Sequence, residues 1–125
     1  DLYLGTGVIN SCIRGTGPAA EKLGQHPVSG VTLEGAALPH WQETLDIAVK
    51  AHSVFPEFGV CGFDIAITKE GPKVLECNDN PSHMLYQMGT GRGLQNPDLA
   101  PIWDRVIARQ DKAVARMQAA MKKKR

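Results

Sequence analysis

The strongest constraint on the fold of this chain is a stretch in which two apolar runs flank a short turn signal. Residues 60–67 and 72–77 have the length and apolar content of β-strands, and Lys69-Glu70-Gly71 lies between them. Two strands joined by so short a connection pair antiparallel, as a hairpin. We therefore expect a fold that contains an antiparallel sheet.

The turn decides where the carboxylates of this hairpin lie. A three-residue loop, residues 69–71 with Gly71 in the left-handed conformation, predicts four cross-strand pairs: Thr68 with Pro72, Ile65 with Leu75, Asp64 with Glu76, and Gly62 with Asn78. It also puts Glu76 on one face with Val74 and Asn78. A four-residue loop would send Asp64 and Glu76 to opposite faces, because a slip of one residue flips every side chain.

The predicted pairing of Asp64 with Glu76 indicates a metal site. Side chains directly opposite each other have Cβ atoms roughly 4.5–5.5 Å apart, and like charges at that distance repel. A divalent cation removes the conflict, and carboxylate oxygens with the Asn78 carbonyl suit Mg²⁺ or Mn²⁺. Gly62, opposite Asn78, leaves room for a ligand to approach. The alternative is that Asp64 and Glu76 are solvated residues on an exposed sheet face, and spacing alone does not decide between the two.

The rest of the chain predicts helices around this hairpin. Apolar residues recur at helical spacing from Leu38 to His52, with Pro39 suited to the first turn and an end before Pro56. Pro101 opens a second, longer helix. Residues 1–37 are rich in glycine, with short strand-like pieces at 3–9 and 28–33. We predict an α+β fold, with an antiparallel sheet packed against helices and residues 1–125 as a single domain.

Composition excludes several classes of function. The 125 residues carry 14 Lys and Arg against 13 Asp and Glu, a net charge of +1 that gives no global case for nucleic acid or an anionic membrane. No apolar run is long enough to span a bilayer. The basic tail at residues 122–125 is interpreted as a solvated helix end.

The cysteines indicate the compartment of the protein, and the first residues indicate whether the chain is part of a longer one. Cys12, Cys61 and Cys77 are odd in number and lack CxxC spacing, which favours reduced thiols in a cytoplasmic protein over a zinc site or disulfides. The chain begins at Asp1 without a basic leader or a Met, so we expect it to be part of a longer protein.

The hairpin resembles the metal signature of the ATP-grasp superfamily: Asp64 inside one strand, then Glu76-x-Asn78 at the end of the next, then a loop with proline. Within it, the chain is most similar to the sugar-transfer associated ATP-grasp proteins, which are related to α-L-glutamate ligases. Five segments carry this likeness: His26-Pro27-x-x-Gly30, Leu38-Pro39-x-Trp41, Phe55-Pro56, Gly62-x-Asp64-Ile65-Ala66 and Gly71-Pro72. One departure is Phe63, where the subgroup commonly has Trp.

The resemblance implies the C-terminal lobe of an ATP-grasp fold, with Asp64, Glu76 and Asn78 binding ATP through Mg²⁺ or Mn²⁺. It also implies a carboxylate–amine ligase that acts through an acyl-phosphate on a small-molecule or peptide-like substrate. ATP-grasp enzymes use an N-terminal lobe that these 125 residues do not supply, so we expect the chain alone to bind ATP weakly and to be inactive. Two alternatives stay open: a non-catalytic interaction module with a metal-site-like hairpin, and a phosphotransferase acting on a sugar or hydroxyl acceptor.

Three further residues are candidates for the site. Arg14, beside Gly15-Thr16-Gly17, is a candidate catalytic residue that could bind a phosphate or an acceptor carboxylate. Ser82 is a candidate contact to nucleotide or acceptor, and His83 a candidate catalytic residue, because both follow Glu76-x-Asn78. For Arg14 and His83, an ordinary surface position is the alternative.

Overall fold

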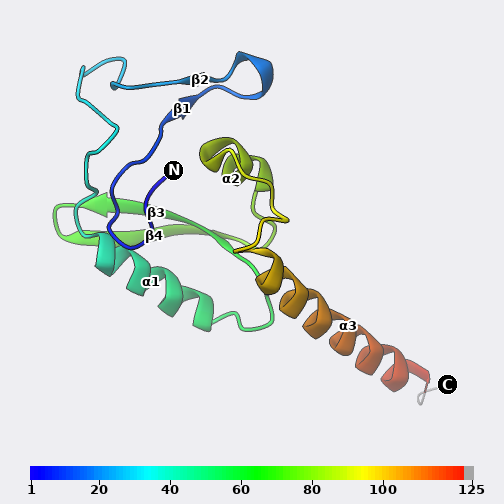
Figure 1. Ribbon diagram of the computed structural model, residues 1–125. Coiled ribbons are helices and arrows are strands. Elements are labelled where there is room, and N and C mark those ends of the chain that lie inside the picture. Colours follow the sequence, from blue (N-terminus) through cyan, green and yellow to red (C-terminus); the bar gives the residue numbers. More distant parts are fainter. Residues whose placement is uncertain (123–125) are drawn as a thin grey trace. The chain divides into compact units, whose positions relative to one another are not determined.

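A computed structural model of the protein describes residues 1–122, so the predicted basic tail beyond Lys122 lies outside the described residues. Its elements in chain order are β1 (Ile13–Arg14), a 3-10 turn η1 (Gly17–Ala19), β2 (Glu21–Lys22), α1 (Trp41–Ser53), β3 (Gly62–Thr68), β4 (Gly71–Asn78), α2 (His83–Thr90) and α3 (Ala100–Lys122) (Figure 1). The described strands form two antiparallel sheets of two strands each, β1–β2 and β3–β4. The α+β class is confirmed.

The chain divides into two compact units, Asp1–Arg92 and Gly93–Arg125. The first unit contains both sheets, α1 and α2; the second contains α3. The single domain predicted for residues 1–125 stays a prediction. No helix within residues 1–122 has the length and apolar character needed to cross a membrane.

Helix α1 begins two residues later than its proline suggested. His40, at φ 54°, is the N-cap, so Pro39 lies before the helix and not in its first turn. The His40 carbonyl accepts the backbone N–H of Thr44 at 2.9 Å and its hydroxyl at 2.8 Å, which fixes the first turn. The helix ends at Ser53, before Pro56, as predicted.

One face of the β3–β4 hairpin packs against α1 (Figure 1). Phe63, Ile65 and Ile67 line a groove together with apolar α1 residues that include Trp41 and Leu45. The edge of the His52 ring lies against Phe63, with ring centroids 6.4 Å apart. No large apolar side chain within residues 1–122 is fully buried, so this layer is a half-covered core.

The hairpin has the predicted pairing of Asp64 with Glu76, but its turn and register differ from the predicted ones. Thr68 pairs with Gly71 around a two-residue turn, Lys69-Glu70, so the predicted three-residue loop is wrong. A β-bulge between Asp64 and Ile65 leaves Leu75 as an extra residue: Ile65 pairs with Val74, and Asp64 with Glu76. The pairs Asp64–Glu76 and Gly62–Asn78 are confirmed, whereas Thr68–Pro72 and Ile65–Leu75 are wrong.

The bulge also corrects the predicted faces. Asp64 and Ile65 are consecutive and point to opposite faces, so their partners Glu76 and Val74 lie on opposite faces too. Val74 lies on the α1 side with Ile65, whereas Glu76 lies with Asp64 on the other side.

The first 37 residues form shorter strands than predicted, and at other positions. The pieces at 3–9 and 28–33 contribute only isolated bridges, Leu2 to Ile9, Val8 to Ala37 and Gln25 to Thr32. The strands of this region are β1 and β2, two residues each. Polar, glycine-rich sequence buries too little apolar surface to specify longer pairing.

Candidate functional site

The candidate site is the face of the hairpin opposite α1. Asp64 and Glu76 form a cross-strand pair there, and Asn78 lies on the same face because it pairs with Gly62, two residues before Asp64. Asp64 and Glu76 are exposed, and Asn78 is half-buried. The prediction that these three side chains share a face is confirmed.

The donor set fits a hard divalent cation. Neither Asp64 nor Glu76 has a hydrogen-bond or ion-pair partner within residues 1–122, so no cation of the described chain neutralises the pair. No group of three or more His, Cys, Asp or Glu side chains suited to a metal occurs within those residues. Two carboxylates and an amide oxygen are therefore the available ligands. Such a set suits Mg²⁺, which keeps waters or phosphate oxygens in its other positions.

The open space predicted beside Gly62 is filled by the chain itself. A Cβ built on Gly62 would lie 2.8 Å from the Cβ of Pro81, in the loop after β4. The expectation that this glycine leaves room for a ligand is therefore wrong. Gly62 instead lets Pro81 of this loop pack tightly on the strand, directly before Ser82 and His83 in the sequence.

Ser82 and His83 lie where this loop becomes α2. Ser82 is the N-cap residue of α2, is exposed, and makes no side-chain capping bond, so its hydroxyl is not engaged by the helix. His83 is the first residue of α2 and is half-buried. The roles predicted for the two residues stay predictions.

Arg14 lies in the β1–β2 sheet, opposite Glu21. Its Nε donates to Glu21 Oε1 at 2.6 Å, and its guanidinium Nη2 forms an ion pair with the same carboxylate. Both side chains are at least half exposed. This arginine is already paired within the chain, and its predicted role stays a prediction.

Cys61 and Cys77 are neighbouring free thiols, a pairing that the sequence analysis did not predict. Cys77 pairs with Phe63 and so lies on the α1 side of the hairpin, and Cys61 is two residues before Phe63. Burial, followed by the neighbouring Cys77 thiol and the charges of Asp79 and Glu57, raises the pKa of Cys61. The signal in the sequence was the alternation of residues 61, 63 and 65.

Comparisons with known proteins identify the family of this chain. No curated protein and no solved structure matches this chain. A family model described as "Sugar-transfer associated ATP-grasp" matches residues 2–100, which include both sheets, α1, α2 and all six candidate residues. This match suggests an ATP-binding enzyme. The chain belongs to the sugar-transfer associated ATP-grasp family.

Proposed function

We propose that this chain is the ATP- and magnesium-binding lobe of an ATP-dependent carboxylate–amine ligase. The observation that supports it most is the pairing of Asp64 with Glu76 on an exposed face, with Asn78 beside them. Two adjacent carboxylates without a cationic partner destabilise a hairpin by repulsion, so a structural role does not explain them.

Each ligand would contribute an oxygen atom. Asp64 and Glu76 would hold Mg²⁺ through carboxylate oxygens, and Asn78 through its side-chain carbonyl. Bound there, Mg²⁺ supplies charge neutralisation for the phosphate oxygens of ATP. Positioning and electrostatics account for most of phosphoryl transfer, so the chain's main contribution is to hold the nucleotide in place.

The neighbouring residues would act on the substrate. The exposed Ser82 hydroxyl is available to a phosphate or to the acceptor, and His83 follows it as the first residue of α2. Arg14 would have to exchange its bond to Glu21 for one to an anionic substrate. In the ligase reaction an acceptor carboxylate is phosphorylated, and an amine then displaces the phosphate from the acyl-phosphate.

A second candidate is phosphoryl transfer to a sugar or another hydroxyl acceptor. The family description, sugar-transfer associated, favours an acceptor of this kind. Both candidates use the same metal-binding face and differ in the nucleophile. Profiling the intact protein with carboxylates, amines and sugars separates them: ADP release that requires both a carboxylate and an amine indicates the ligase.

The metal site is tested by paramagnetic broadening. Manganese titration into ¹⁵N-labelled chain should broaden the signals of Asp64, Glu76 and Asn78 first, and the signals of Arg14 and Glu21 last. Uniform broadening, or none, would contradict the site and favour the non-catalytic module. In the intact protein, Asp64→Ala and Glu76→Ala should abolish ATP turnover while the circular dichroism spectrum stays unchanged.

A further inference from the structure

Helix α3 lies outside the part of the chain that defines the family. The family match ends at residue 100, and α3 spans Ala100–Lys122 in its own compact unit. None of its 23 residues is buried. Within α3, Ala100, Trp103 and Val106 are half-buried and every other residue is exposed. The exposed apolar residues of this helix call for an explanation other than the ATP-grasp fold.

One side of α3 is apolar in both halves of the helix and is interrupted by Gln110 near the middle. At about 100° per residue, seven apolar side chains fall within an arc of roughly 140°: Ile102, Trp103, Val106, Ile107, Val114, Met117 and Met121. Exposure is high in the second half, at 67% for Met117 and 70% for Met121. This apolar stripe exceeds what a solvated helix needs.

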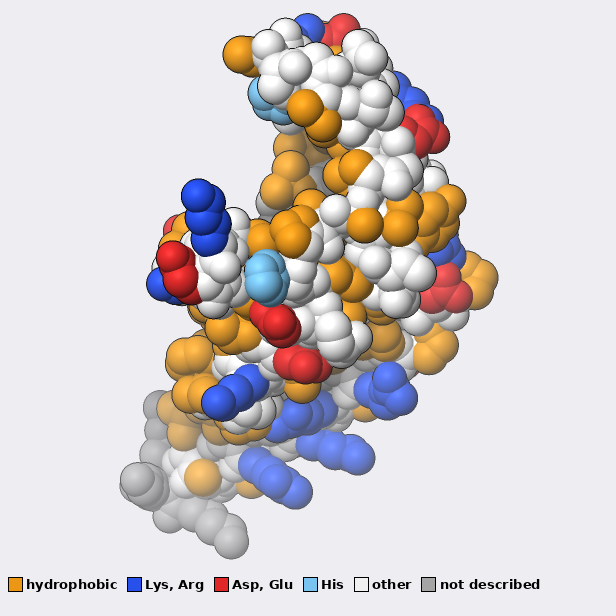
Figure 2. Space-filling view, turned by 90° about the vertical axis from the view of Figure 1, so that its left-hand side faces the viewer, with side chains coloured by type: hydrophobic (Ala, Val, Ile, Leu, Met, Phe, Trp, Pro, Cys, Tyr) orange, Lys and Arg blue, Asp and Glu red, His pale blue; other side chains and the backbone are white. Residues whose placement is uncertain are grey.

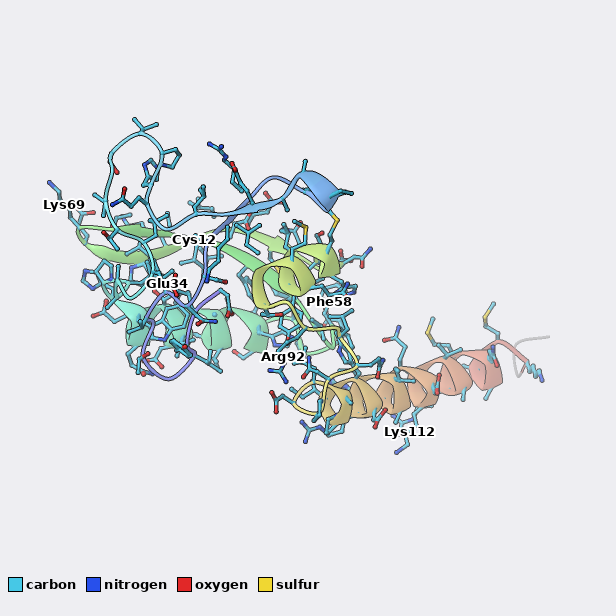
Figure 3. The ribbon with its side chains drawn as sticks, turned by 45° about the horizontal axis from the view of Figure 1, so that its top comes forward. Cys12, Glu34, Phe58, Lys69, Arg92 and Lys112 are labelled. Carbon is cyan, nitrogen blue, oxygen red and sulfur yellow. The ribbon has the colours of Figure 1, made fainter. Side chains whose placement is uncertain are left out.

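A basic stripe runs directly beside the apolar one. Arg105, Arg109, Lys112 and Arg116 are spaced by four, three and four residues, so they share one face, and they line a shallow groove floored by Ala108 and Ala113. Figure 2 shows Lys and Arg side chains gathered over the α3 part of the surface, and Figure 3 shows Lys112 pointing away from the helix. The net charge of +1 for the whole chain conceals this stripe.

The acidic residues of α3 lie on the remaining side. Asp104 and Asp111 fall roughly opposite the boundary between the apolar and the basic stripe. One half of the helix surface is therefore apolar and cationic, and the other half carries both carboxylates. This separation orients the helix towards a surface that is both apolar and anionic.

We propose that α3 binds in the plane of an anionic lipid membrane, with its apolar stripe in the lipid and its basic stripe on the headgroups. Charge complementarity favours a membrane over three other partners: a second copy of α3, nucleic acid and an acidic protein groove. Ala100–Lys122 carries five cations and two carboxylates, so a second copy of α3 is repelled. Nucleic acid would use the basic stripe but leave the apolar one exposed. An acidic protein groove favours bulky aromatic anchors, whereas the exposed members of the stripe are the aliphatic residues Ile102, Ile107, Val114, Met117 and Met121. A fluid bilayer requires no such anchors.

The test is co-sedimentation of the whole chain with vesicles. We expect binding to vesicles of phosphatidylglycerol and phosphatidylcholine in a 3:7 ratio, and none to pure phosphatidylcholine. Each basic residue near an anionic surface contributes about fivefold in partitioning, so replacing the four residues of the basic stripe with Gln should weaken binding at least about 100-fold. Binding to neither vesicle type would overturn the proposal.

A matched control distinguishes the effect of the basic stripe on vesicle binding from the effect of net charge. Lys22, Lys50, Lys69 and Lys73 are exposed and lie outside α3, and changing these four to Gln removes the same charge. This control should retain binding; equal loss in both variants would overturn the proposal. Met117→Ser with Met121→Ser should weaken binding by about tenfold or more, since both lose apolar burial. Binding to soluble polyglutamate as tight as to vesicles would also overturn it, in favour of an acidic partner.

Discussion

The protein contains two sheets of the same kind, β1–β2 and β3–β4, and they differ in what specifies their pairing. The β1–β2 sheet pairs only Ile13 with Lys22 and Arg14 with Glu21, and all four residues are exposed. The β3–β4 hairpin pairs seven residues of β3 and has α1 against one face. An apolar face fixes which side chains point outward, so the hairpin can present two carboxylates in a defined place.

The comparison shows where a site can be built. In β1–β2 each cation is paired with a carboxylate of the chain, Arg14 with Glu21 and Lys22 with Glu34. In β3–β4 two like charges are paired, and the packing of Phe63, Ile65 and Ile67 on the other face stabilises an arrangement that repulsion opposes. Packing on one face thus permits an unfavourable charge pair on the other.

The largest expected effect comes from moving one carboxylate to the wrong face. Exchanging two neighbours, Glu76→Cys with Cys77→Glu, keeps the composition but places the carboxylate opposite Phe63 on the α1 side. Manganese affinity, measured by electron paramagnetic resonance, should fall by more than about tenfold, the lower end expected even for outer-shell partners.

The matching exchange in β1–β2, Arg14→Glu with Glu21→Arg, should preserve both the ion pair and manganese affinity. If the hairpin exchange leaves affinity unchanged, Glu76 is not a ligand.

The next largest effect is on stability, when a glycine in or beside each sheet is replaced by alanine. Gly62→Ala places a Cβ at 2.8 Å from Pro81 and should lower the free energy of unfolding by about 1–3 kcal/mol through overpacking. Gly24→Ala, just after β2, meets nothing within 4 Å and should change it by only a few tenths of a kcal/mol. Urea unfolding measures both, and equal effects would refute tight packing of Pro81 on β3.

A smaller effect is expected from the ion pair of β1–β2. Arg14→Ala removes an exposed pair with Glu21, so the free energy of unfolding should fall by less than about 1 kcal/mol. Glu21→Ala should have a similar effect. A loss of ATP turnover in the intact protein with Arg14→Ala, but not with Glu21→Ala, would instead assign Arg14 to the substrate.

The smallest effect concerns thiol reactivity. Burial and the Cys77 thiol raise the pKa of Cys61, so less thiolate is present at pH 8 and iodoacetamide should alkylate Cys61 more slowly than Cys12, which is also half-buried. The stabilising contribution of protonated Cys61 is present below its ordinary pKa and is lost as pH rises through the folded value. Peptide mapping by mass spectrometry gives both rates, and faster alkylation of Cys61 would contradict the shift.

The pairing of Asp64 with Glu76 was predicted correctly from sequence, but from a three-residue loop without a bulge, whereas the structure has a two-residue turn and a bulge. The turn itself was predicted wrongly: Lys69-Glu70 with Gly71 at φ 105° closes a tighter hairpin. The bulge at Leu75 compensates by one residue, and no local propensity marks it. Packing of β4 against α1 selects that register, which is tertiary information.

Helix α2 was missed for a related reason. Its eight residues, His83–Thr90, closely follow Pro81 and include Gly89, with Gly91 just beyond, and such glycines and prolines are typical of a loop. Gly91 is in fact the C-cap, in the left-handed conformation at φ 66°. Short helices of this kind depend on their surroundings more than on their own sequence.

The bulge in β4 has a consequence for how such sites are found in other sequences. A regular antiparallel ladder closed by a two-residue turn pairs only residues whose positions differ by an odd number, so Asp64 would face Leu75. Glu76 lies twelve positions after Asp64, and an even separation needs either a three-residue loop or one bulge. Deleting Leu75 should therefore keep the two carboxylates opposed, in a ladder without a bulge. The parity of the spacing between two hairpin ligands, taken together with the length of the turn, thus indicates whether the strands between them are regular.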